Sequence, residues 1–130
     1  MILLDTHCAL WVELAPEKLS EKAKARLLDA EGAGEALAIS CISLWEIAQM
    51  DSRNQLELSV SRDRFLAELE ADFEILPVDR RVVLHAARLG DPFPKDPMEK
   101  LIVGTALAND LTLITADGRI RTANVCNTLW

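Results

Sequence analysis

The sequence has few of the residues that build disulfide or zinc sites, with three cysteines and two histidines in 130 residues. The cysteines, Cys8, Cys41 and Cys126, are odd in number and far apart, which indicates free thiols in a reducing cytoplasm. The sequence contains no Cys-x-x-Cys pair, so a zinc site beside His7 and Cys8 is disfavoured.

Long apolar runs and a basic N-terminal segment are also missing. No run approaches the roughly 18 apolar residues that a membrane span needs. The chain starts Met-Ile-Leu-Leu-Asp, without the positive charges of a secretory signal. We therefore expect a cytoplasmic protein that neither spans a membrane nor is exported.

Positive charge is scarce as well. The net charge of −7 disfavours a general nucleic-acid-binding protein. The deficit lies in residues 1–76, which carry 7 basic and 15 acidic side chains, whereas residues 77–130 carry 7 basic and 6 acidic ones. A basic surface, if the protein has one, is expected from Arg80, Arg81, Arg88, Lys95, Lys100, Arg119 and Arg121.

The sequence does have enough apolar residues for one globular domain. Apolar residues make up 50% of the chain and charged residues 27%. A chain of this size can bury roughly two-thirds of the surface that it exposes when unfolded. No linker, repeat or low-complexity tract divides it, so we expect a single domain over residues 1–130.

Short apolar runs alternate with segments of helical periodicity. We expect strands at residues 1–4, 37–41, 73–78 and 111–115, with a short fifth strand at 125–126. We expect helices at residues 6–13, from the cap Ser20 to Gly32, from the cap Ser43 to about residue 53, and at 61–72, 82–89 and 97–109. A loop over residues 91–95 separates the last two helices. This alternation predicts an α/β fold with a parallel sheet of about five strands flanked by helices.

Acidic side chains gather at one edge of the predicted sheet: Asp5 after the first strand, Asp117 after the fourth, and Glu46, Asp96 and Glu99 in the first turns of two helices. Open parallel sheets bind ligands at the carboxyl ends of their strands. Crowded carboxylates repel one another unless a cation neutralises them. Oxygen ligands suit Mg²⁺ or Mn²⁺ rather than zinc, so we expect one of these cations here.

Several of these acids also have a structural interpretation. Residues 43–46 and 96–99 both fit a capping box, in which Glu46 or Glu99 bonds back to the start of its own helix. Asp117 could cap the turn into Gly118.

Other functions fit the sequence less well. A phosphoacceptor receiver domain needs an Asp after the third strand, where Val78 stands. A phosphatase with an Asp-x-Asp nucleophile needs an acid in place of His7. Aromatic rings could stack on bases, but the helical spacing around Trp11 and Trp45 favours core packing for both. No residue looks like a covalent nucleophile.

Four segments together resemble the motifs of PIN-domain proteins, and in particular those of the VapC-type toxins of toxin–antitoxin pairs. They are residues 3–11, 43–48, 96–106 and 112–117. The likeness extends over nearly the whole chain. It implies a three-layer sandwich with a five-stranded parallel sheet, Mg²⁺- or Mn²⁺-dependent cleavage of RNA, a cognate antitoxin and a homodimer.

The resemblance also implies roles for the acidic residues. Asp5, Glu46 and Asp117 match the first, second and fourth acidic positions, and Glu99 matches the third. The metal ligands would be Asp5, Glu99 and Asp117, with Asp96 as the alternative to Glu99. Glu46 would orient water or hold a second ion.

Supporting roles follow for nearby polar residues. The expected hydroxyls around the acids are Thr6, Ser43 and Thr115, and the expected RNA contacts are Lys95, Lys100, Arg119 and Arg121. Two residues depart from the family pattern, because Glu99 stands for a usual Asp and Lys100 for a usual Arg. These departures keep open a PIN-like module that binds RNA or protein without cleavage. A non-toxin RNA-processing nuclease is a second alternative.

Overall fold

The protein is described by a computed structural model that covers residues 1–90 and 93–130. Its centre is a five-stranded sheet with the order β3-β2-β1-β4-β5, in which every neighbouring pair is parallel. The strands are β1 (Ile2–Leu4), β2 (Leu37–Ser40), β3 (Glu74–Leu76), β4 (Leu113–Ile114) and β5 (Thr128–Leu129). The predicted α/β fold is confirmed.

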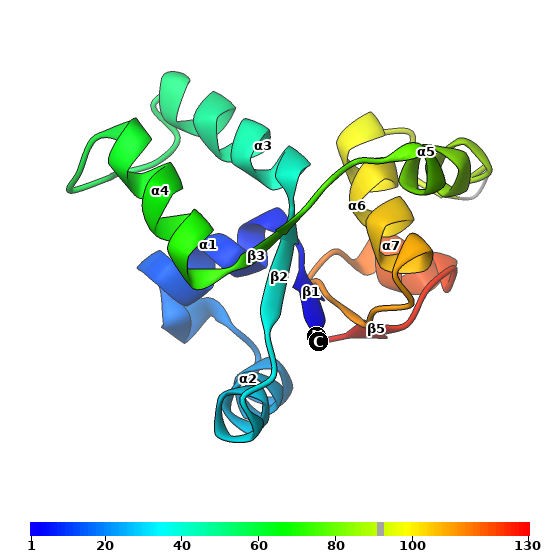
Figure 1. Cartoon of the computed structure of the whole chain (residues 1–130), viewed down its shortest axis with the longest axis horizontal. Coiled ribbons are helices and arrows are strands. Elements are labelled where there is room, and N and C mark those ends of the chain that lie inside the picture. Colours follow the sequence, from blue (N-terminus) through cyan, green and yellow to red (C-terminus); the bar gives the residue numbers. More distant parts are fainter. Residues whose placement is uncertain (91–92) are drawn as a thin grey trace.

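Helices cover both faces of this sheet. Those before β3 are α1 (Thr6–Leu14), α2 (Glu21–Ala33), α3 (Cys41–Ser52) and α4 (Arg62–Asp72), with a 3-10 turn at Pro16–Lys18. Those after β3 are α5 (Arg80–Ala87), α6 (Pro97–Ala108) and α7 (Gly118–Ala123). Figure 1 shows α1, α2 and α4 on one side of the sheet and α5, α6 and α7 on the other. In the described part of the chain, no helix is long and apolar enough to cross a membrane.

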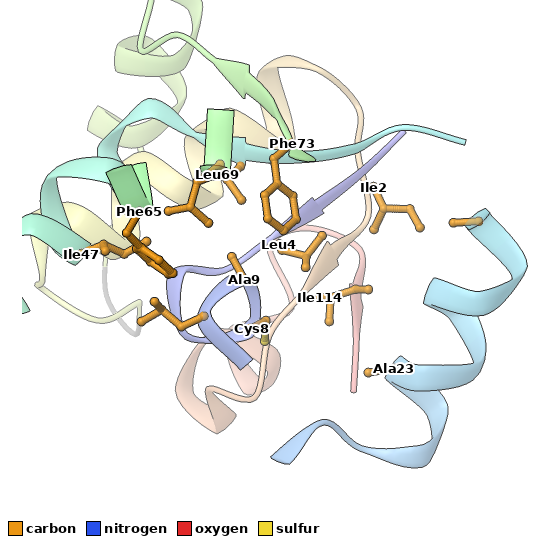
Figure 2. Close-up of a cluster of buried hydrophobic side chains, with 13 residues drawn as sticks. Ile2, Leu4, Cys8, Ala9, Ala23, Ile47, Phe65, Leu69, Phe73 and Ile114 are labelled. Carbon is orange, nitrogen blue, oxygen red and sulfur yellow. The ribbon is translucent and has the colours of Figure 1, made fainter. Parts of the chain in front are cut away.

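The central strands β1 and β4 are apolar because both faces of the sheet are buried there. Successive strand residues point to opposite faces. Leu4 and Ile114 pack with Phe65 in the cluster on the α1, α2 and α4 side (Figure 2). Leu3 and Leu113 belong to the second cluster, on the side of α6 and α7.

The end of the chain differs from the sequence-based expectation. Residues Gly118–Ala123 form helix α7, which the sequence did not predict, and the fifth strand is Thr128–Leu129 rather than residues 125–126. Asn124 ends α7 in the left-handed conformation, with φ of 51°. With six residues, α7 is too short to produce a helical repeat in the sequence.

Two helices begin earlier than expected. The α3 helix begins at Cys41, and the Ser40 hydroxyl caps it by accepting a hydrogen bond from the Ile42 N–H at 3.2 Å. Ser43 is therefore not the cap, and Glu46 lies in the second turn rather than the first. The α5 helix begins two residues before the expected position. Of the expected loop, residues 91 and 92 lie outside the described residues.

The strand order determines where a ligand site can form. From β1 the chain passes to β2 and β3 on one side of the sheet, and it then returns to β4 and β5 on the other side. The carboxyl ends of β1 and β4 are neighbours at this change of direction. Open α/β sheets bind their ligands at such a point.

Candidate active site

Asp5 lies at the carboxyl end of β1, beside the end of β4. Both carboxylate oxygens accept hydrogen bonds, Oδ1 from the Thr6 N–H at 2.8 Å and Oδ2 from the Thr115 hydroxyl at 2.8 Å. Burial raises the pKa of Asp5 above its ordinary value, although these two bonds act to lower it. The side chain is held in one orientation, and the protein compensates its charge only in part.

Asp117 follows β4 and caps α7. Its Oδ1 accepts from the backbone N–H groups of Arg119 at 2.8 Å and Ile120 at 3.4 Å, which confirms the capping role. Burial acts to raise its pKa, but the hydrogen bonds from Arg119 outweigh burial and hold the pKa below its ordinary value. The Asp117 N–H donates to the Thr115 hydroxyl at 3.1 Å. One threonine side chain thus joins Asp117 to Asp5.

Glu46 reaches the same place from α3. The Thr6 hydroxyl donates to Glu46 Oε1 at 2.6 Å and lies 2.8 Å from the Ser43 hydroxyl. Since Thr6 gives its only hydroxyl proton to Glu46, Ser43 donates to Thr6. Burial raises the pKa of Glu46, and the bond from Thr6 opposes that rise. The capping box expected at residues 43–46 is wrong, because Glu46 turns to Thr6 instead.

Asp96 and Glu99 have different environments in the first turn of α6. Asp96 is the exposed cap, and its Oδ1 accepts from the Met98 N–H at 2.8 Å. The Glu99 side chain is only 17% exposed, and its Oε1 accepts from Nη2 of Arg119 at 2.6 Å. Glu99 Oε2 is buried with no hydrogen-bond partner among the described residues. The capping box expected at residues 96–99 is therefore also wrong.

Arg119 bridges two of the acids. Its Nη2 lies 2.6 Å from Glu99 Oε1 and 3.1 Å from Asp117 Oδ2. Burial and the nearby charge of Asp117 nevertheless raise the pKa of Glu99 to about 7, against the lowering effect of Arg119. One guanidinium does not neutralise this corner of the site.

All these acids line one cleft of about 360 Å³. The residues around it are Asp5, Thr6, His7, Trp11, Glu46, Asp96, Glu99, Ile102, Ala116, Asp117 and Arg119. The donor set fits a hard divalent cation because it consists of carboxylate oxygens, including the unpartnered Oε2 of Glu99. Within residues 1–90 and 93–130, the structure does not bring three acidic, histidine or cysteine side chains close enough together to hold one ion. Arg119 instead links two of the acids.

The thiol next to the site is not a nucleophile. Cys8 is fully buried in the core cluster, and burial raises the pKa of its thiol to about 12. All three cysteines are free thiols, as expected from their spacing.

One of the cations expected to contact RNA lines the cleft. In the described part of the chain, Arg119 is the only member of the expected set that lines the cleft. The other three are Lys95, Lys100 and Arg121. Arg119 pairs with two acids in the described structure, and the set of RNA contacts stays a prediction.

The tryptophans behave differently from one another. Trp11 packs against Trp130, with ring centroids 5.7 Å apart, at the border of the core. Trp45 is 54% exposed, so the expectation of core packing is wrong for this residue. Sequence reasoning also missed Arg53, which lines a hollow beside the cleft together with Trp45. The sequence did contain one signal for a role of Trp45 at the site, which is its position directly before the candidate acid Glu46.

The chain is similar in sequence and in fold to known proteins. A family model described as the PIN domain matches residues 2–125. The chain is similar to Ribonuclease VapC22 of Mycobacterium tuberculosis, with 30% identity over 120 residues that cover 92% of this chain and 89% of that protein. It is also similar to the crystal structure of VapBC2 from Rickettsia felis bound to a DNA fragment from their promoter. The TM-score is 0.74 and the identity 16%, covering 99% of this chain and 98% of that one. A toxin–antitoxin complex from Klebsiella pneumoniae matches with a TM-score of 0.68 and 20% identity, covering 100% and 97% of the two chains.

Proposed function

The chain belongs to the PIN-domain family, and we propose that it is an endoribonuclease that hydrolyses RNA phosphodiester bonds with Mg²⁺ or Mn²⁺. The observation that carries this proposal is the cleft beside the ends of β1 and β4, whose lining includes four carboxylates besides that of the cap Asp96. They belong to Asp5, Glu46, Glu99 and Asp117. The similarity to a ribonuclease of Mycobacterium tuberculosis supports RNA as the substrate.

Three carboxylates would hold the cation: Asp5, Glu99 and Asp117, with Asp96 as the alternative to Glu99. Bound there, Mg²⁺ or Mn²⁺ supplies positive charge for the phosphoryl oxygens and lowers the pKa of water. A cation that takes the Glu99 and Asp117 oxygens now paired with Arg119 would displace its guanidinium from one of them. Its guanidinium is then available to donate hydrogen bonds to the RNA phosphate.

Glu46 is suited to take a proton from the attacking water. The Ser43–Thr6–Glu46 hydrogen-bond chain holds its carboxylate in place, and burial raises its pKa, which makes it a stronger base. Asp5 is equally restrained because Thr6 and Thr115 bond to its two oxygens. The three hydroxyls therefore position the acids that act on water and phosphate.

The proposal extends to the protein's partners. We propose that the chain is the toxin of a pair and that a cognate antitoxin protein restrains it, as the toxin–antitoxin complex from Klebsiella pneumoniae suggests by similarity. We expect it to act in the cytoplasm, because its three cysteines are free thiols. A homodimer stays a prediction.

A second candidate function is a module that binds RNA or protein without cleaving it. The observation in its favour is the pairing of Arg119 with both Glu99 and Asp117, which a cation has to break. A housekeeping RNA-processing nuclease would share the chemistry of a toxin. Growth of the host cell, rather than cleavage, distinguishes those two.

The test is cleavage of a broad RNA panel by the wild type with Mg²⁺ or Mn²⁺, by the wild type with EDTA, and by Asp5→Asn. The asparagine fits the same place, because its oxygen can accept from the Thr6 N–H and its amide can donate to the Thr115 hydroxyl. We expect EDTA and the substitution each to abolish cleavage, with thermal unfolding close to that of the wild type.

Asp29→Asn is the matched control, because it removes one charge from an exposed position on α2 and should leave cleavage unchanged. A wild type that is loaded with metal and cleaves no RNA in the panel would overturn the proposed function.

A further inference from the structure

A second hollow, of about 410 Å³, opens beside the candidate active site along α3. Three residues line both this hollow and the cleft: His7, Glu46 and Asp96. The two therefore form one continuous groove. Beyond the shared residues, its lining consists of Trp45, Gln49, Met50, Arg53, Gln55 and Met98, and we call this part the α3 groove.

One face of α3 supplies most of the α3 groove. Trp45, Gln49 and Arg53 are four residues apart, so their side chains lie one above another on the same side of the helix. The core-facing side of α3 is already occupied by Ile47, which is fully buried. The exposed ring of Trp45 is therefore not required to pack α3 onto the sheet.

Arg53 places a positive charge at the far end of the α3 groove. It is exposed at the C-cap of α3, and the ion pairs formed within the described residues do not include it. Nearby Asp51 is paired with Arg62 at 2.7 Å. At 1.5 Å of rise per residue, Arg53 lies about 10 Å along the helix from Glu46.

Any RNA with a phosphate in the cleft must continue out of it on both sides of the scissile bond. The α3 groove is an open exit of this kind, since its lining begins with the same Glu46 that faces the cleft. Proteins hold single strands by stacking bases on aromatic rings and by placing cations along the backbone. The α3 groove contains one group of each type, Trp45 and Arg53.

Building on the proposed ribonuclease activity, we propose that the α3 groove binds the single-stranded RNA next to the scissile phosphate. A base stacks on the exposed ring of Trp45, and the guanidinium of Arg53 holds a backbone phosphate further along. Gln49 lies between them on α3, where its amide can donate to and accept from the edge of a base.

The test measures RNA binding in the Asp5→Asn background, where the RNA stays intact. The probe is a short fluorescein-labelled single-stranded RNA of mixed sequence, titrated by fluorescence anisotropy at fixed salt. We expect Trp45→Ala to weaken binding about 5-fold to 150-fold, and Trp45→Phe to restore part of the loss because it keeps an aromatic face. Arg53→Gln should weaken binding and lower the slope of log K against log salt by about 0.7.

Two substitutions away from the α3 groove serve as matched controls. Leu84→Ala removes an apolar side chain of α5 that is 50% exposed, close to the 54% of Trp45. Lys22→Gln removes an exposed cation from α2 that, like Arg53, is in none of the ion pairs formed within the described residues. Both should bind the RNA like the Asp5→Asn parent. Stacking should also quench tryptophan fluorescence in the parent, and Trp45→Phe should reduce that quenching, with Trp11 in the cleft left in place.

The outcomes separate this inference from the proposed function. Unchanged RNA binding in both Trp45→Ala and Arg53→Gln, with a wild type that cleaves RNA, would overturn the α3 groove and leave the ribonuclease intact. Unchanged RNA binding together with lost antitoxin binding would assign the groove to a protein and overturn the inference too. RNA binding that depends on Trp45 and Arg53, in a protein that never cleaves, would support the groove and overturn the ribonuclease.

Discussion

At the scale of single residues, Glu99 combines a buried oxygen without a partner and a pKa near neutrality. Its Oε2 accepts no hydrogen bond in the described structure, and burial with the charge of Asp117 raises its pKa to about 7. Both properties mark a carboxylate whose charge the folded chain does not fully compensate. They belong to the residue that sequence reasoning favoured over Asp96 as a metal ligand.

Glu99 should make stability depend on pH. Its pKa of about 7 in the folded protein lies above the ordinary 4.5. Between pH 4.5 and pH 7, the folded chain therefore keeps a proton on Glu99 that the unfolded chain has released. With a chelator present, the free energy of unfolding should therefore fall as the pH rises from about 4.5 to about 7. Glu99→Gln should remove this part of the pH dependence and weaken Mg²⁺ and Mn²⁺ binding. Chemical denaturation across pH and calorimetric metal titration measure the two effects.

Asp96→Ala is the matched comparison in the same helical turn. It removes the cap bond to the Met98 N–H, which should cost about 1 kcal/mol of stability with a smaller effect on metal binding. Loss of metal binding in Asp96→Ala, with binding retained in Glu99→Gln, would show that the two assignments are reversed.

Arg119 should compete with the cation, because one Nη2 atom contacts both Glu99 and Asp117. We expect Arg119→Gln to bind Mn²⁺ roughly 2-fold to 5-fold more tightly, the size of a partly exposed ion pair. Calorimetric titration measures this affinity without reference to cleavage. Arg121→Gln, at an exposed position of the same helix, should bind Mn²⁺ like the wild type. Equal or weaker Mn²⁺ binding by Arg119→Gln would contradict the competition.

At the scale of elements, the contact between α5 and α6 determines where α6 places its first turn. Gly104 of α6 lies so close to α5 that a Cβ there would stand 2.7 Å from the backbone oxygen of Val82 and 3.2 Å from the Cβ of Ala86. The backbone of Val82 cannot move aside as the end of a flexible side chain could. A larger residue would push the two helices apart, and Glu99 would move with α6.

Gly104→Ala should therefore lower the free energy of unfolding by about 1–3 kcal/mol, the usual cost of overpacking. Gly32→Ala is the control, since Gly32 lies inside α2 with nothing within 4 Å of the added methyl group. That change should stabilise the protein by up to about 1 kcal/mol, because alanine favours a helix more than glycine. Denaturant unfolding of both variants checks the pair, and equal stability of the two would contradict the close contact.

At the scale of the whole molecule, the chain combines an acidic cleft with a fold similar to that of a toxin–antitoxin complex from Klebsiella pneumoniae. Expression of the wild type alone should arrest growth, and co-expression with the product of the adjacent gene should relieve the arrest. Asp5→Asn should be harmless at the same protein level. Colony counts and growth curves measure this, and harmless expression of protein with confirmed cleavage would indicate a housekeeping nuclease.

Much of the fold was predictable because its signals are local. The continuous apolar run at Leu3 and Leu4 marked a strand buried on both faces, and Ser20 marked a helix cap that the structure confirms at 3.0 Å from the Ala23 N–H. The α7 helix was missed because its six residues contain no repeat. The start of α3 was misplaced because Ser40 ends β2 and caps the helix at once.

The sequence by itself determined the fold class, the family and the order of acids along one sheet edge, since periodicity, capping and motif spacing act over a few residues. Only the tertiary structure decided which side chains meet. The bond from Thr115 to Asp5 spans 110 positions, that from Thr6 to Glu46 spans 40, and that from Arg119 to Glu99 spans 20. Such contacts depend on strand order and helix packing. For the same reason the exposed ring of Trp45 beside the cleft became visible only in the folded chain.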